Sequence, residues 1–248
     1  MAQISANLKP GKRRGILKRS AMVAFGFILA YLFVAYIFMP AWWKRDDKEH
    51  PSLEDIPNIT YTKDGIPGDP LNVSLIGTKP DLVKAMLAAQ WHPADSLSLK
   101  SCLEIAAATI LERSYADAPV SSLYLFGRKE DLAFEQPVGN DPKKRHHVRF
   151  WQTNQTDSND RPVWIGSGTY DKRVGLSGTT GQITHHIDAD VDTERDHVIQ
   201  SLKLSGDLLE SYMVDGFHKT LTGRNGGGDL WKTDGKLSCG VIAIKQSP

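Results

Sequence analysis

The stretch HVRFWQTNQTDSNDRPVWIGSGTY, residues 147–170, decides the fold class. Two runs in it, His147–Thr153 and Pro162–Tyr170, are rich in β-branched and aromatic residues and are typical of strands. Parallel neighbours need a crossover of about a dozen residues or more. The short connection between the two runs therefore predicts an antiparallel pair.

Elements of both kinds flank this pair. Strands are predicted at Leu71–Gly77, Ser122–Arg128, Gln182–Ile187, from Leu209, and at Leu237–Ile244, with Gly223–Gly228 as a loop tip. Helices are predicted from Thr78, with Asp81 three residues later, through Trp91, from Ser98 to about Glu112, and from Asp190 or Asp192. We therefore expect an α+β domain with a mostly antiparallel sheet and packed helices.

An uncharged segment precedes this domain. Ala21–Met39 covers roughly 28 Å as a helix, which is close to the hydrocarbon thickness of a bilayer. Trp42 and Trp43 follow where an aromatic belt belongs. A cleaved signal peptide would have a shorter apolar part and a small-residue cleavage site. The sequence thus predicts a basic cytoplasmic tail (1–20), a single transmembrane helix (21–43), a linker (44–68) and an extracytoplasmic domain (69–248).

Charge is unevenly distributed along the chain. Residues 1–20 hold six of the 30 Lys and Arg residues and no acid, whereas residues 44–63 hold four Lys and Arg. The positive-inside rule therefore places the N-terminus in the cytoplasm. The remaining 24 basic residues are outnumbered by 29 acidic ones, which argues against nucleic acid as a partner. The predicted transmembrane helix makes the lipid bilayer an expected partner.

Signatures of several enzyme classes are missing from the sequence. It has no G-x-x-x-x-G-K-[ST] loop and no H-E-x-x-H helix. The segment Gly175–Thr179 departs from G-x-S-x-G at its last residue. Cys102 and Cys239 are expected as two buried thiols, although an oxidising compartment would also allow them to pair.

Polar side chains concentrate in HHVRFW, residues 146–151. Strand alternation places His147, Arg149 and Trp151 on one face. Arg149 and Trp151 are candidates for binding a ligand or an anionic group. The alternative is a structural role, in which the Arg149 stem covers aromatic surface and its guanidinium pairs with an acid.

A second concentration is THHIDADVDTERD, residues 184–196. Its imidazoles and carboxylates are candidate ligands of a divalent metal ion, and an EF-hand is excluded because Thr193 stands where its glycine belongs. Alternatively, the acids cap a helix and oppose its dipole. We hypothesise that both segments meet in one cleft, with these candidate metal ligands: His147, His185, His186, Asp188 and Asp190.

At these same residues the sequence resembles the LssY C-terminal domain family, from about Asp69 to Leu204. The resemblance rests on DPLNVSLIG, APVSSLYLFGRKEDLAFEQPVG, RHHVRFW, VGLSGTTGQITHHID and ERD, in this order. It implies a domain of bacterial membrane proteins, sometimes attached to DedA-like or lipid-phosphatase-like modules and named for a type I secretion locus. It implies no known reaction. With the basic tail, it predicts a single-pass protein of the bacterial inner membrane.

Two functions are consistent with the sequence. The preferred one is a non-enzymatic, membrane-anchored envelope domain that binds another envelope or secretion component, because the anchor is clear and catalytic signatures are missing. The alternative is a metal-dependent hydrolase acting on phosphate esters or lipids near the membrane, with Arg149 binding the anionic group.

The orientation can be tested with reporter fusions placed after Pro248. A reporter that is active only outside the cytoplasm should be active, because the more basic flank precedes the helix. Activity of a cytoplasmic reporter alone would contradict the orientation, and release of the protein by alkaline carbonate would contradict the membrane span.

Overall fold

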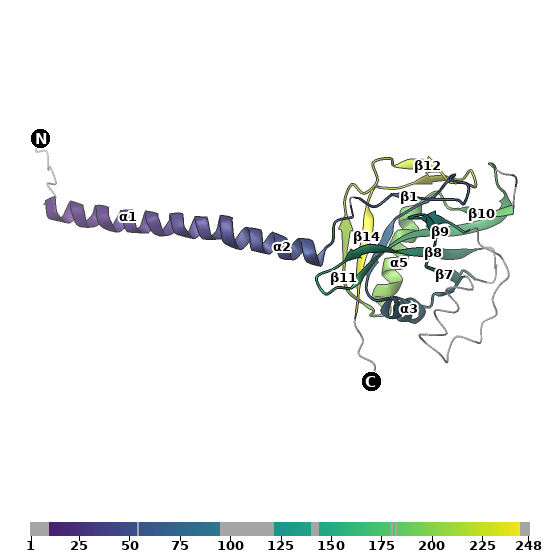
Figure 1. Cartoon of the computed structure of the whole chain (residues 1–248), viewed down its shortest axis with the longest axis horizontal. Coiled ribbons are helices and arrows are strands. Elements are labelled where there is room, and N and C mark those ends of the chain that lie inside the picture. Colours follow the sequence, from purple (N-terminus) through teal and green to yellow (C-terminus); the bar gives the residue numbers. More distant parts are fainter. Residues whose placement is uncertain are drawn as a thin grey trace, which may run out of the picture. The chain divides into compact units, whose positions relative to one another are not determined.

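The computed structural model describes residues 10–53, 55–94, 122–139, 144–179, 181 and 183–243. The chain forms two compact units, Met1–His50 and Pro51–Pro248 (Figure 1). The helix predicted at Ser98–Glu112 lies outside the described residues.

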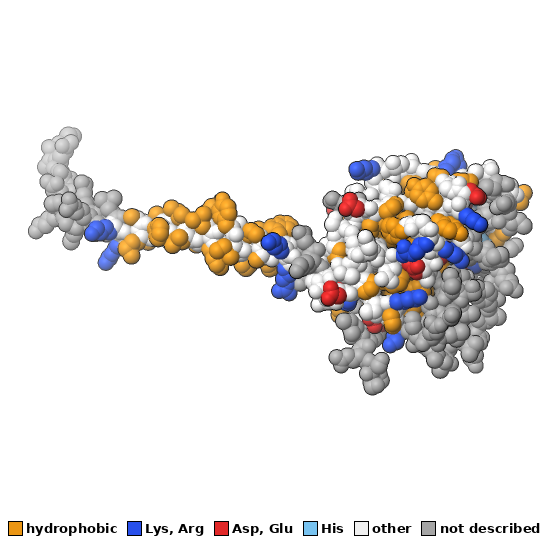
Figure 2. All heavy atoms as spheres, viewed as in Figure 1, with side chains coloured by type: hydrophobic (Ala, Val, Ile, Leu, Met, Phe, Trp, Pro, Cys, Tyr) orange, Lys and Arg blue, Asp and Glu red, His pale blue; other side chains and the backbone are white. Residues whose placement is uncertain are grey.

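The first unit is helical from α1 (Pro10–Phe33) through a π-helical turn, η1 (Val34–Phe38), to α2 (Met39–Glu49). Its segment Lys18–Arg45 has a mean hydropathy of 2.4 and is long and apolar enough to cross a membrane. Figure 2 shows hydrophobic side chains around this helix, with Lys and Arg near each end. The predicted span Ala21–Met39 lies within the segment, which is consistent with single-pass anchoring.

The second unit is built on an eight-stranded sheet. The order is β11-β14-β3-β9-β8-β7-β4, and β10 pairs with β9 off this path. Only the pairing of β14 with β3 is parallel among these described strands. The α+β prediction is confirmed. The strands are β3 (Val73–Ile76), β4 (His92–Pro93), β7 (Leu132–Pro137), β8 (Arg145–Thr156), β9 (Pro162–Leu176), β10 (Ile183–Ile187), β11 (Leu208–Val214) and β14 (Leu237–Ile242).

Two helices, α3 (Lys79–Ala88) and α5 (Val191–Leu204), share an apolar core with one face of this sheet. Both helices begin as the sequence predicts. Thr78 accepts a hydrogen bond from the Asp81 backbone N–H, and Asp190 accepts one from that of Thr193. Each cap satisfies a backbone donor that the first helical turn leaves unpaired.

The other face of the sheet has its own apolar cluster, which includes Leu53, Trp151 and Cys239. Leu123 and Leu125 join it from a small sheet of order β2-β1-β5-β6. The strands of this sheet and of a separate hairpin are β1 (Ile59–Tyr61), β2 (Pro67–Pro70), β5 (Tyr124–Leu125), β6 (Arg128–Lys129), β12 (Thr222–Arg224) and β13 (Leu230–Lys232).

Two boundaries differ from the prediction. The predicted linker 44–68 includes β1 and the first half of β2, and Leu53 is only 4% exposed, so the folded unit begins at Pro51. The single strand predicted at Ser122–Arg128 is a tight hairpin, because Phe126 and Gly127 both adopt positive φ. Two consecutive residues of this kind reverse the chain.

The thiol of Cys239 is buried and free. Burial raises its pKa to about 12, which keeps it protonated and unreactive at neutral pH. Cys102, the other cysteine of the predicted pair, lies outside the described residues.

The new boundary can be tested by comparing fragments that begin at Pro51 and at Asp69. The shorter one lacks Leu53, the strand β1 and the hydrogen bond from Thr60 Oγ1 to the Asp69 carbonyl. Loss of a buried leucine side chain alone costs about 2–5 kcal/mol. Urea unfolding should show a cooperative transition for the longer fragment and a much less stable or unfolded shorter one. Equal midpoints would contradict the boundary.

Candidate functional site

The face of β8 that carries Trp151 changes from apolar to charged along the strand. Trp151 lies in the apolar cluster with Ile165, its partner on β9. The residues on this face toward the start of β8 are polar, and each has a polar partner directly opposite on β9. The pairs are Arg149 with Ser167, His147 with Thr169, and Arg145 with Asp171.

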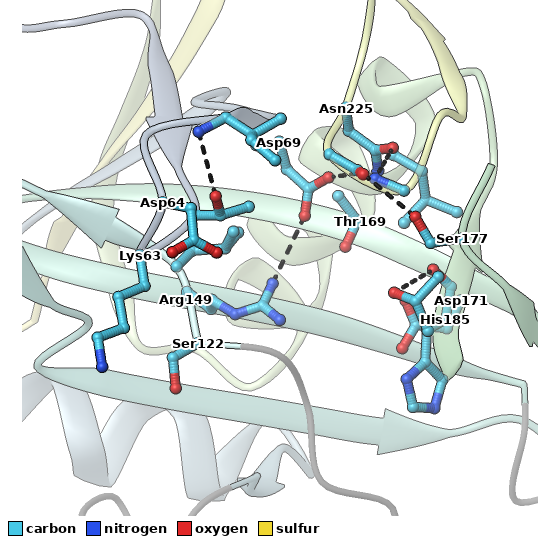
Figure 3. Close-up of a pocket in the computed structure, with 18 residues that line it drawn as sticks. Lys63, Asp64, Asp69, Ser122, Arg149, Thr169, Asp171, Ser177, His185 and Asn225 are labelled. Carbon is cyan, nitrogen blue, oxygen red and sulfur yellow. Dashed lines mark hydrogen bonds and ion pairs between the residues drawn. The ribbon is translucent and has the colours of Figure 1, made fainter. Parts of the chain in front are cut away.

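A pocket of about 240 Å³ opens over this polar half. Its walls come from the β1–β2 segment, from β8 and β9, from β10, and from the loop between β12 and β13 (Figure 3). Asp69, Arg149, Thr169, Asp171 and His185 are among the lining residues. Strands from distant parts of the sequence therefore build one polar site.

Arg149 is one of two arginines on this face, and its side chain is 5% exposed. Its Nη1 lies 3.6 Å from Asp69 Oδ2, while Asp69 Oδ1 accepts a hydrogen bond of 2.9 Å from the Asn225 amide. Burial raises the pKa of Asp69, and the charge of Arg149 opposes that rise. Arg149 thus pairs with an acid, Asp69, as the structural alternative predicted, and this pair lies at the wall of a cavity.

Arg145 is the centre of a buried polar network. Its Nε donates to Asp171 at 3.0 Å, its Nη1 to Glu135 at 2.6 Å, and its Nη2 lies 3.2 Å from His185 Nε2. A guanidinium can only donate, so His185 Nε2 accepts and the imidazole is neutral. Burial, with Arg145 and Arg149 nearby, lowers the pKa of His185 to about 4. Arg145 was not among the residues predicted from the sequence, although strand alternation from His147 places it on the same face.

His147 lies between the two arginines on β8 and is 1% exposed. Burial and the charges of Arg149 and Arg145 hold its pKa well below the usual range, so the ring is neutral. Among the residues that the structure describes, neither of its ring nitrogens has a hydrogen-bond partner, and the same is true of the Thr169 hydroxyl opposite. Buried polar atoms of this kind are rare in folded proteins and indicate a site where a further group binds.

The other predicted site residues lie apart from this pocket. His186 Nδ1 contacts Asp229 Oδ1 at 2.7 Å, and Asp188 pairs with Lys172 at 2.9 Å. Asp190 caps α5, as the helix-capping alternative predicted.

The pocket therefore brings Arg149 and His185 together, with His147 opposite a lining residue. His186 and Asp188 do not line this pocket. Trp151 lies in the apolar cluster instead of the pocket wall, because β8 has passed into the core at that point. Metal binding by the five predicted ligands stays a prediction.

A family model described as "LssY C-terminus" matches residues 53–237. The chain belongs to the LssY C-terminal domain family. No curated protein and no solved structure matches the chain. The match begins at Leu53, a buried residue near the start of the folded unit, and ends at the first residue of β14. The LssY C-terminal domain thus contains every strand that lines the pocket.

The neutral state of His185 makes the stability of this LssY C-terminal domain depend on pH. The folded-state pKa is about 4 and the ordinary value is 6.5, so the unfolded chain takes up the proton first. The stabilisation of the folded domain by neutral His185 is complete above pH 6.5 and is lost as the pH falls toward 4. In His185→Gln, the glutamine oxygen can still accept from Arg145 but does not titrate.

We expect urea unfolding between pH 7 and pH 4.5 to show a larger loss of unfolding free energy for the wild type than for His185→Gln. Comparing the two slopes cancels the titration of the carboxylates that both proteins share. Parallel profiles would contradict a neutral, arginine-bound His185.

Proposed function

We propose that this membrane-anchored domain is a non-enzymatic binding component of the bacterial cell envelope. Its pocket holds an anionic group of another envelope or secretion component. The observation that carries the proposal is the guanidinium of Arg149 in the wall of a polar cavity of about 240 Å³. Arginine is well suited to bind carboxylate or phosphate, because it can donate two parallel hydrogen bonds.

The surroundings of Arg149 support an anionic ligand. Arg149 Nη1 lies 3.6 Å from Asp69 Oδ2, so the guanidinium is held in place at the cavity wall. The Thr169 hydroxyl faces the same cavity. A phosphate or carboxylate group would therefore meet a guanidinium and a hydroxyl donor, with the neutral His185 at the wall.

The anchor supports a place at the inner membrane. A helix from Lys18 to Arg45 can cross the bilayer, and the six basic residues before Ala21 favour a cytoplasmic N-terminus. The pocket would then face the extracytoplasmic space, where envelope lipids, glycans and secretion components are the available partners.

The alternative, a metal-dependent hydrolase using this pocket, has less support. A hydrolytic metal site needs about three protein ligands around one ion. Four of the five predicted ligands have other partners: His185 accepts from Arg145, His186 pairs with Asp229, Asp188 pairs with Lys172, and Asp190 pairs with Lys232 and caps α5. Among the described residues this leaves His147 alone at the pocket, too few ligands for such a site. Binding without turnover is therefore the better account of the pocket.

The binding proposal can be tested with inorganic phosphate as the probe. Phosphate should raise the unfolding temperature of the full chain in neutral detergent above that in chloride of equal ionic strength. Arg149→Gln should weaken the apparent affinity by about 10- to 100-fold, because a charged hydrogen bond contributes about 1.5–3 kcal/mol. The matched control is Arg173→Gln, which removes the same charge from an exposed position outside the pocket lining.

Equal phosphate affinity in both variants would contradict the proposal, because general charge attraction would then explain the binding. Phosphate release from para-nitrophenyl phosphate that requires a divalent metal and is lost in Arg149→Gln would favour the hydrolase instead.

A further inference from the structure

A second polar cluster lies on the opposite face of β8. His146 alternates away from the pocket, toward α5, where Glu194 and His197 stand three residues apart. One potential ligand atom from each of these three residues lies within 4.8 Å of the other two. The imidazole rings of His146 and His197 are stacked, with 3.8 Å between their centroids. This cluster involves none of the residues assigned to the pocket.

Glu194 supplies the observation that points to a ligand. Its side chain is 2% exposed, and its Oε2 contacts His146 Nδ1 at 2.7 Å. Its other oxygen, Oε1, is buried with no hydrogen-bond partner in the part of the chain that the structure describes. A buried carboxylate oxygen without a donor costs free energy, and a cation satisfies it directly.

The state of His197 is also suited to ligation. Its Nε2 lies 2.8 Å from Gln136 Oε1, and the Gln136 amide nitrogen is oriented toward the carbonyls of Ala89 and Gln90. The amide oxygen can only accept, so His197 Nε2 carries the proton and Nδ1 keeps its lone pair. A hydrogen bond from the ring nitrogen that does not bind the metal orients metal-binding histidines in this way.

We propose that His146, Glu194 and His197 form a site for a divalent transition metal ion, of which Zn²⁺ is the best match. Two imidazoles and one carboxylate are ligands that zinc accepts. The ion would take the place of the hydrogen between His146 Nδ1 and Glu194 Oε2, with that proton passing to solvent, and would give Glu194 Oε1 a partner.

The site is accessible from solvent. His146 and Glu194 line a cleft of about 310 Å³ together with Tyr170 and Asp188. Three protein ligands leave at least one coordination position of zinc for water or another small ligand. Water or the small ligand would reach that position through the cleft. Metal chemistry in this protein would thus be located on the α5 side of the sheet, away from Arg149.

The experiment is a titration of the full chain, purified in detergent without a histidine tag and stripped of metal, with Zn²⁺ against a chromophoric chelator. One equivalent should bind. Co²⁺ in its place should give the visible absorption bands of a low-symmetry site. His146→Gln and His197→Gln should each weaken zinc binding by at least about 10- to 100-fold. Changing even a group that only hydrogen-bonds to a metal ligand has effects of that size.

The matched control is His186→Gln. His186 also contacts a carboxylate through Nδ1 at 2.7 Å, that of Asp229, and it was a ligand candidate from the sequence. This variant should keep wild-type zinc affinity. Loss of zinc binding in His186→Gln alone, or equal affinity in all variants, would overturn the proposal, as would absence of zinc and cobalt binding by the wild type.

Folding of each variant is checked by circular dichroism and thermal unfolding. If His146→Gln does not fold, His197→Gln and the cobalt spectrum of the wild type still decide the outcome. Phosphate binding that depends on Arg149 is a separate measurement, so either proposal can fail without the other.

Discussion

The antiparallel pairing of β8 with β9 is the constraint on which both sites depend. Its register sets Arg145 opposite Asp171 and His147 opposite Thr169. Side chains alternate along a strand, so a slip of one residue would turn these charged groups toward the helices and Val148 toward the pocket. On the other side of β9, Asn72 joins this strand to α5, because its side chain exchanges two hydrogen bonds with the backbone of Gly168 and donates a third to Val191.

The buried guanidinium of Arg145 connects four strands. It contacts Glu135 on β7, Asp171 on β9 and His185 on β10. Burying a charge is unfavourable unless its partners are well placed, and removing one partner of a buried pair costs about 3–5 kcal/mol. Displacement of any of these strands would leave a charge without its partner. The network therefore selects one arrangement of the strands, and this arrangement creates the pocket wall.

Local signals in the sequence were sufficient for the long strands, the helix caps at Thr78 and Asp190, and the polar face with Arg149. They were insufficient for β1 and β2. These strands are short, and β2 contains Pro67, Gly68 and Pro70, which strands disfavour. Pairing with residues far away in the sequence stabilises these strands, and such pairing leaves no periodic pattern in the sequence. The cluster of His146 with α5 was missed for the same reason, since Glu194 lies 48 residues away in the sequence.

His146 and His147 are adjacent in the sequence but belong to different sites, because the sheet separates them. The separation is not electrostatically complete: the charge of Asp171, on the pocket side, contributes to raising the pKa of Glu194 on the other side. Repulsion of this kind acts in both directions. The sheet thus separates the contacts of the two sites but not their electrostatic fields.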